Sequence, residues 1–132
     1  MSAVELPELA RRLLDGNVFV VLGTVNPDGA PQSSVIWATY EGERVIFSTI
    51  LGRRKTGNMT RDPRVSLLVY DPADAYRYVE VRGTVSMTRD GGPELIQRLS
   101  LDYTGRPFTE GNAANVRVVC QLTPATTIVH RD

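Results

Sequence analysis

Three consecutive cations, Arg-Arg-Lys at positions 53–55, directly follow Gly52 near the middle of the chain. An apolar run at 44–50 leads into them, and a segment long enough for two helical turns follows before Pro63. A glycine turn that opens a helix presents unpaired backbone N–H groups, and these groups, the helix dipole and the cations all attract negative charge. The pattern predicts a site that binds a phosphate group; the alternative is a solvated basic turn between two strands.

Two further groups of side chains could bind a flat ring attached to such a phosphate. Gln32, Ser33 and Ser34 supply amide and hydroxyl groups on a strand with apolar neighbours, although ordinary outward-facing polar positions would look the same. Aromatic residues could stack on the ring, with core or interface packing as the alternative; they are Trp37, Tyr76 and Tyr78. In this interpretation Arg53 and Lys55 bind the phosphate, and Asn58 either reaches the same group or caps the turn.

Side chains that perform catalysis on their own are scarce in this sequence. The single histidine, His130, stands two residues from the C-terminus, and the single cysteine, Cys120, lies in an apolar run that predicts a small buried side chain. We therefore expect no metal site, no Ser-His-Asp set and no catalytic side chain. If the protein is an enzyme, a bound cofactor carries the chemistry.

Composition is ordinary for a globular protein, with 42% hydrophobic and 23% charged residues, and 132 residues predict one domain spanning 1–132. Lysine plus arginine equals aspartate plus glutamate, so no overall charge attracts nucleic acid or a membrane. One cysteine excludes an internal disulfide, and neither a signal segment nor a membrane span is evident. The simplest compartment is the cytoplasm.

Hydrophobic periodicity and turn residues predict the elements that position these groups. Strands at 18–25, 30–40 and 44–49 form a meander, and strands at 65–70 and 76–88 follow, the latter with a bulge or bend at Gly83. Two last strands, 115–122 and 126–130, are separated at Pro124. Helices are expected at 6–15 and 93–103, besides the helical turns before Pro63. We therefore expect a mainly β fold, a closed or partly closed barrel of six to seven antiparallel strands with short helices.

Several of these segments resemble a known family. The hairpin VLGTVNPDGAPQSSVIW, with its Pro31–Gln32 pair, and the segments RRKTGNMTRDPRVSLLV and YRYVEVRGTV are similar to the split β-barrel flavin- and deazaflavin-binding proteins, the superfamily that includes pyridoxamine 5′-phosphate oxidase. The sequence resembles most closely the actinobacterial branch that uses the deazaflavin coenzyme F420. The resemblance extends over nearly the whole chain and implies an FMN-binding-like split barrel.

The resemblance also implies a homodimer with cofactor sites in grooves between the subunits. Arg53 and Lys55 match the phosphate contacts, and the loop 104–112 helps to shape the substrate pocket. Tyr76 departs from the family pattern, because one of the two aromatic positions contributed by the partner subunit is often tryptophan in relatives. The remaining cofactor-binding positions expected from the resemblance are Gln32, Ser33, Ser34, Val35, Thr49, Thr56, Asn58, Tyr76 and Tyr78.

The activity implied is an F420-dependent reductase, an oxidoreductase that passes a hydride from reduced F420 to an electron-poor acceptor such as an enone, a quinone or a tetrapyrrole. No histidine is needed, because the protein only orients the two partners and excludes water. The alternatives are an FMN-binding oxidoreductase of the pyridoxamine phosphate oxidase type and a non-catalytic cofactor-binding protein.

Overall fold

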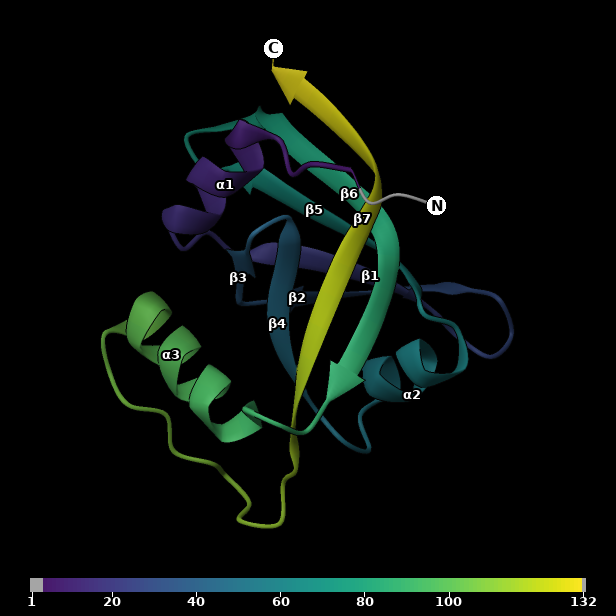
Figure 1. Cartoon of the computed structure of the whole chain (residues 1–132), viewed down its shortest axis with the longest axis vertical. Coiled ribbons are helices and arrows are strands. Elements are labelled where there is room, and N and C mark those ends of the chain that lie inside the picture. Colours follow the sequence, from purple (N-terminus) through teal and green to yellow (C-terminus); the bar gives the residue numbers. More distant parts are fainter. Residues whose placement is uncertain (1–3, 132) are drawn as a thin grey trace.

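The computed structural model describes residues 4–131 and contains one curled, seven-stranded antiparallel sheet with three short helices around it (Figure 1). The strand order is β2-β1-β5-β6-β7-β4-β3. This architecture confirms the prediction of a mainly β split barrel of six to seven strands. The elements are α1 (Glu8–Asp15), β1 (Val20–Val25), β2 (Pro31–Ile36), β3 (Ala38–Glu41), β4 (Arg44–Ile50), α2 (Arg54–Arg61), β5 (Arg64–Asp71), β6 (Asp74–Thr88), α3 (Gly92–Thr104) and β7 (Arg117–Arg131).

The hydrophobic core fills the inside of the curled sheet. Alternate residues of the strands point inward, as the period of two requires, and the leucine stripe of α1 closes one side of the same core. A smaller cluster lies on the outer face, where α3 packs Leu95 and Leu99 against Ile46 and Val119 of β4 and β7. The sheet therefore carries apolar contacts on both faces along β4 and β7.

The segment predicted as one strand at 30–40 is two strands, which corrects the expected meander. β2 pairs with β1 and β3 pairs with β4, as expected, but the chain bends at Trp37 and places β2 and β3 at opposite edges of the sheet. Tyr103 of α3 holds this bend: its hydroxyl accepts from Ala38 N–H at 3.1 Å and donates to the Val18 carbonyl at 2.7 Å, and its ring stacks on Trp37. Because the Tyr103 hydroxyl bonds these backbone groups, the strand can bend there without leaving them unpaired.

The last segment is one strand rather than two, which corrects the expected break at Pro124. β7 runs through Pro124 and pairs with β6 along most of its length. The register shifts where Gly83 lies opposite Pro124 and Arg82 opposite Thr126, which confirms the bulge predicted at Gly83. A Cβ atom at Gly83 would lie 2.0 Å from the Thr123 carbonyl oxygen, so only glycine allows this close approach.

The three helices lie in the segments that the sequence predicts as helical. α1 and α3 occupy the predicted segments, and the central helical turns become α2, which ends at Arg61 with Asp62 as its C-cap directly before Pro63. Among residues 4–131 no helix is long and apolar enough to cross a membrane.

Candidate functional site

The turn between β4 and α2 forms the cationic centre that the sequence predicts. Gly52 adopts a positive φ of 98°, which glycine permits at little cost, and α2 then begins after Arg53. The N-terminus of α2 has no side-chain cap and no acidic residue in its first turn, where Arg54 and Lys55 stand instead. Cations are unfavourable at the positive end of a helix dipole. An anion bound there would offset this repulsion and accept bonds from the free N–H groups.

A cavity of about 310 Å³ opens beside this turn, between the outer face of β4 and β7, the end of β2, helix α3 and the loop that follows it. The lining of the cavity combines three cations with apolar and aromatic side chains. Its lining residues are Phe19, Val35, Ile36, Trp37, Ser48, Arg53, Lys55, Ile96, Leu99, Phe108 and Arg117. This combination suits a ligand with a flat apolar body and an anionic group.

Lys55 is a half-buried cation of this cavity. Burial lowers the pKa of its ammonium group, and the positive charges of Arg53 and Arg117 lower it further. Nearby Cys120 is fully buried, and burial raises the pKa of its thiol to about 12, which confirms the predicted small buried side chain. A bound anion would stabilise the charged form of Lys55.

Arg117, at the start of β7, belongs to the cavity but was not singled out from the sequence. Its Nε and Nη2 atoms each lie 2.7 Å from Oε1 of Glu110, and its guanidinium lies 4.7 Å from the centre of the Phe108 ring. The Arg117 guanidinium lowers the pKa of the Glu110 carboxyl. In the sequence Arg117 looks like any outward residue of a strand, because only the fold brings the loop residues Glu110 and Phe108 to it.

Asn58 ties α2 to the β1–β2 hairpin. Its Nδ2 atom lies 3.0 Å from Thr24 Oγ1, 2.9 Å from Asn26 Oδ1 and 3.2 Å from Gln32 Oε1, and the residue is 1% exposed. The Thr24 hydroxyl donates to the same Gln32 oxygen at 3.1 Å. The Asn58 side chain therefore positions Gln32 from inside the protein.

Thr49 and Thr56 join α2 to β4 in the same manner. Their hydroxyl oxygens lie 2.8 Å apart, Thr56 donates to the Ile50 carbonyl at 2.6 Å, and both residues are buried. Among the cofactor-binding residues predicted from the sequence, the cavity brings together Val35, Arg53 and Lys55. The other predicted residues near it lie on its supporting elements: Gln32, Ser33 and Ser34 on β2, and Thr49, Thr56 and Asn58 on β4 and α2.

Tyr76 and Tyr78 lie apart from this cavity within one chain. They stand near the beginning of β6, whereas β6 ends close to α2 (Figure 1). Tyr78 stacks on His130 with ring centres 4.9 Å apart, and the Tyr76 side chain is 72% exposed. These tyrosines could approach a ligand in the cavity only from a second copy of the chain.

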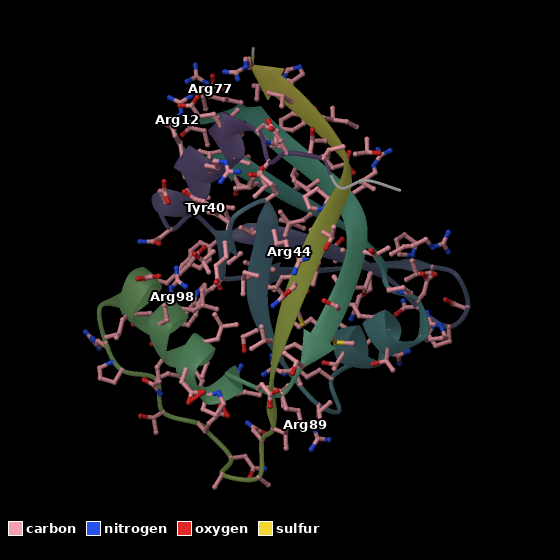
Figure 2. All side chains as sticks on the ribbon, in the orientation of Figure 1. Arg12, Tyr40, Arg44, Arg77, Arg89 and Arg98 are labelled. Atoms are coloured by element: carbon pink, nitrogen blue, oxygen red, sulfur yellow. The ribbon has the colours of Figure 1, made fainter. Side chains whose placement is uncertain are left out.

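Elsewhere the arginines are dispersed. Figure 2 labels five exposed ones, Arg12, Arg44, Arg77, Arg89 and Arg98; Arg12 and Arg77 lie near each other at the top of the view, and the other three project from separate parts of the molecule. Within residues 4–131 no group of three or more histidine, cysteine, aspartate or glutamate residues could hold a metal ion. The cavity beside α2 is therefore the candidate site, and its character is that of an anion-binding pocket with an aromatic wall.

Comparison with known proteins agrees with this character. The family model described as pyridoxamine 5′-phosphate oxidase matches residues 6–130. Two curated relatives named pyridoxine/pyridoxamine 5′-phosphate oxidase match in part: one from Aeromonas hydrophila is 42% identical over 50 residues, and one from Rubrobacter xylanophilus is 35% identical over 72 residues. These matches cover 37% and 54% of this chain, and 24% and 33% of the relatives' own lengths. The chain thus matches about a quarter to a third of each curated relative.

A solved structure of an F420 reductase is similar over almost its whole length. It is 34% identical, has a TM-score of 0.82, and the match covers 93% of this chain and 98% of that chain.

Proposed function

The chain belongs to the pyridoxamine 5′-phosphate oxidase family, and we propose on that premise that it is a reductase that binds coenzyme F420 in the cavity beside α2. The reaction proposed is transfer of a hydride from reduced F420 to an electron-poor acceptor such as an enone, a quinone or a tetrapyrrole. The observation that carries the proposal is the placement of Arg53 and Lys55, at an uncapped helix N-terminus, on the edge of a cavity with an aromatic wall.

The residues present fit a phosphorylated flavin-type cofactor. Arg53, Lys55 and the N–H groups that open α2 would hold its phosphate. Val35 and Trp37 would face the ring. Gln32 lies outside the lining of this cavity, in the hollow beside Asn26 and Asp28. Thr24 and Asn58 occupy its side-chain oxygen, so its NH₂ group would donate to the part of the cofactor that extends along β2.

When bound, reduced F420 supplies the hydride, and the chain supplies position and shielding. Ile96, Leu99 and Phe108 form an apolar wall that excludes water from the reacting atoms. The proton that completes the reduction comes from solvent, so the scarcity of histidine is no obstacle. Phe108 lies in the 104–112 loop, which supports the expectation that this loop shapes the substrate pocket.

The match of 34% identity over 98% of an F420 reductase supports F420 as the cofactor. FMN is the second candidate, because the family model and the curated relatives bear the name of pyridoxamine 5′-phosphate oxidase. The match covers at most 33% of the length of those relatives. Their oxidase activity is therefore less well supported for this chain than F420-dependent reduction.

We further propose a homodimer in which the second copy covers the end of the sheet around Tyr76. Apolar side chains are exposed there on β5, β6 and β7: Tyr70 at 37%, Tyr76 at 72% and Ile128 at 41%. Such a patch on a small domain favours burial by a partner. In this arrangement Tyr76 and Tyr78 would approach the cofactor of the other subunit. Sedimentation equilibrium would test it, and a monomer at micromolar concentration would contradict it.

The test of the cofactor proposal is a titration with F420 and, separately, with FMN, followed by the fluorescence of Trp37, the single tryptophan. We expect Lys55→Ala to weaken F420 binding about 10- to 100-fold, since a hydrogen bond to a charged group contributes roughly 1.5–3 kcal/mol. Arg12→Ala is the control, because Arg12 is an exposed cation on α1, outside the cavity lining and away from the start of α2.

Tighter binding of FMN than of F420 would favour the second candidate. Binding of neither, or a Lys55→Ala variant that melts lower but binds F420 equally well, would contradict the phosphate site. Hydride transfer to menadione, a simple quinone, would then separate a reductase from a cofactor-binding protein without activity.

A further inference from the structure

The cavity holds two cationic centres that come from different elements. Arg53 and Lys55 belong to the start of α2, whereas Arg117 belongs to the start of β7. These three side chains carry three positive charges, and Glu110 beside Arg117 carries one negative charge. The phosphodiester of F420 would bring one more negative charge to the α2 centre. One positive charge of the cavity then remains uncompensated, because the α2 centre has two cations for one phosphodiester while Arg117 is paired with Glu110.

The Arg117 side chain is fixed by its neighbours, as in a binding site, and differs in this from a flexible surface cation. Its side chain is 11% exposed, its Nε and Nη2 atoms are both bound by a single Glu110 oxygen, and its plane rests on Phe108. Phe108 is itself fixed by Gln97, whose amide donates to the Phe108 carbonyl at 2.7 Å and accepts from its N–H at 2.9 Å. This support fixes the guanidinium without using all of its donors.

Two groups in this arrangement are left incompletely bonded. Nη1 of Arg117 has only Ser48 Oγ, at 3.4 Å, which is the outer limit of a hydrogen bond. Oε2 of Glu110 is buried and has no partner within hydrogen-bond geometry among the described residues, although the Asn115 side chain lies near enough to help lower the pKa of this carboxyl. A buried polar group without a partner is costly. Nη1 of Arg117 is therefore available to donate to an acceptor on a ligand, whereas Glu110, itself an acceptor, opposes a second negative charge beside it.

Besides Arg117, the cavity is lined by the apolar side chains of Phe19, Ile96 and Leu99. A ligand that satisfies both kinds of side chain has a flat apolar body and one anionic oxygen group. Resting on the proposed function, we propose that the acceptor reduced at this site is a carboxylic acid, and that Arg117 binds its carboxylate while the apolar wall receives its conjugated ring system. Arg117 is then the residue that selects acidic acceptors over neutral ones.

The experiment is calorimetric titration of the protein saturated with oxidised F420. The probes are anthraquinone-2-carboxylate and its neutral isostere anthraquinone-2-carboxamide, two electron-poor quinones that differ in charge. We expect the wild type to bind the carboxylate about 10-fold tighter than the amide, as one charge-assisted hydrogen bond supplies. Arg117→Met should abolish that preference and leave the amide and F420 affinities within about twofold of wild type.

Glu110→Gln is expected to change the affinity for the carboxylate probe in the opposite direction to Arg117→Met. Removing the resident negative charge should make the carboxylate bind tighter, about 3- to 10-fold, while the amide changes little. A purely structural ion pair predicts the contrary, since loss of either partner would then weaken binding of both probes. Arg106→Gln, at an exposed cation of the same loop, is the matched control and should change neither affinity.

Equal binding of the two probes to wild type, or a preference that survives in Arg117→Met, would overturn the proposal. So would a loss of F420 affinity in Arg117→Met as large as in Lys55→Ala, together with displacement of the carboxylate probe by F420, because Arg117 would then bind an acidic group of the cofactor. If Arg117→Met fails to fold, Glu110→Gln decides, and unchanged or weaker carboxylate binding refutes the proposal.

Failure of the proposed function would be seen separately, as absence of F420 binding to the wild type. The same two probes would then be titrated against the unloaded protein, where the outcomes for Arg117 and Glu110 keep their meaning.

Discussion

The amide nitrogen of Asn58 on α2 lies 3.2 Å from the side-chain oxygen of Gln32 on β2, 26 residues away in the chain. This contact fixes one helix of the candidate site to one strand of it. Asn58→Ala would leave the buried Thr24 hydroxyl and the Gln32 oxygen short of a donor, which costs about 1–3 kcal/mol.

We therefore expect Asn58→Ala to lower the free energy of unfolding by about that amount, measured by urea denaturation, and to weaken cofactor binding because Gln32 loses its orientation. Thr60→Ala is the control, since Thr60 lies on the same helix but is exposed and bonds only within it. Equal stability of the two variants would contradict the role assigned to Asn58.

Lys55 predicts a pH dependence of cofactor binding. Burial and the neighbouring cations lower its pKa below the ordinary value of 10.5, so the ammonium loses its proton at a lower pH than an exposed lysine would. The affinity for a phosphate group should therefore fall as the pH rises through that lowered pKa. Lys55→Arg keeps its charge over this range and should abolish the fall in Trp37-monitored titrations. A decline of the same size in Lys55→Arg would show that another group is responsible.

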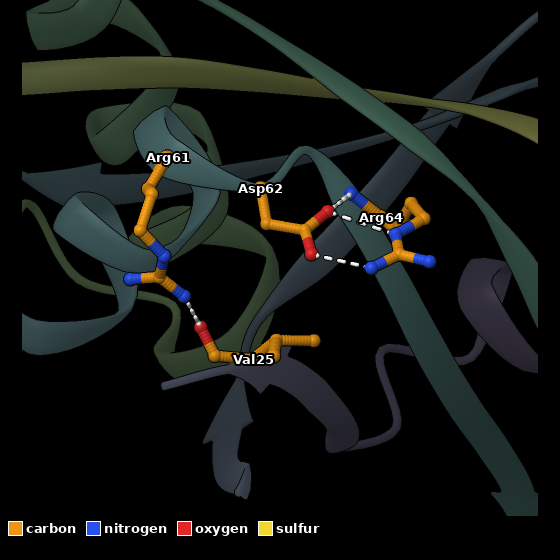
Figure 3. Close-up of polar contacts among 4 residues, drawn as sticks. All are labelled: Val25, Arg61, Asp62 and Arg64. Atoms are coloured by element: carbon orange, nitrogen blue, oxygen red, sulfur yellow. Dashed lines mark hydrogen bonds and ion pairs between the residues drawn. The ribbon is translucent and has the colours of Figure 1, made fainter. Parts of the chain in front are cut away.

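Asp62 and Arg64 predict a loss of stability in acid. Both nitrogens of the Arg64 fork bind the Asp62 carboxylate, at 2.9 and 2.7 Å, while neighbouring Arg61 donates to the Val25 carbonyl (Figure 3). The bonds from Arg64 lower the pKa of Asp62 to about 2, from 3.8. A depressed carboxyl pKa gives stability that is present above the unfolded value and lost as the pH falls from about 4 towards 2.

Asp62→Asn should consequently destabilise the protein at pH 6 and have little further effect at pH 2, as read from urea midpoints. The effect is expected to be small, because the pair is exposed to solvent. Asp90→Asn, at an exposed turn residue, serves as the comparison. An Asp62→Asn penalty that persists unchanged at pH 2 would argue against the ion pair as its cause.

Gly83 predicts a severe packing defect on substitution. The Cβ of an alanine would lie 2.0 Å from a carbonyl oxygen of the neighbouring strand, so β6 and β7 must separate to admit it. We expect Gly83→Ala to destabilise the protein by about 1–3 kcal/mol or more. Gly57→Ala on α2, where nothing lies within 4 Å of the new atom, should instead stabilise it by roughly 0.4–1 kcal/mol. Thermal melts compare the two, and matching melting temperatures would contradict the expectation.

Residue patterns were sufficient for features that depend on local structure. Gly83 interrupts a long alternating strand, and Gly52 precedes three cations, so the bulge and the turn could both be predicted. Trp37 shows the limit: nothing in the apolar run around it marks a bend, because the bend is stabilised by Tyr103 from a distant helix. At Pro124 the sequence predicts a break that the structure does not have. The strand continues through the proline because β6 has a register shift at Gly83, directly opposite it.

The same distinction applies to the candidate site. Arg53 and Lys55 were predictable because their neighbours in sequence form the turn that presents them. Asn58 could be recognised as a polar residue near the turn, but its burial depends on the hairpin 32 residues away. Arg117 had no sequence signal, because its partners Glu110 and Phe108 reach it through the shape of a loop.

The bend at Trp37 also bears on how this protein behaves at high concentration. It leaves the sheet with two outer edges of only six and four residues, and Pro31 removes one backbone donor from the first of them. Short, interrupted edges are poor templates for adding a strand from another molecule. The sharp turn that shapes one end of the pocket therefore also protects the folded chain against edge-to-edge aggregation and growth into fibrils.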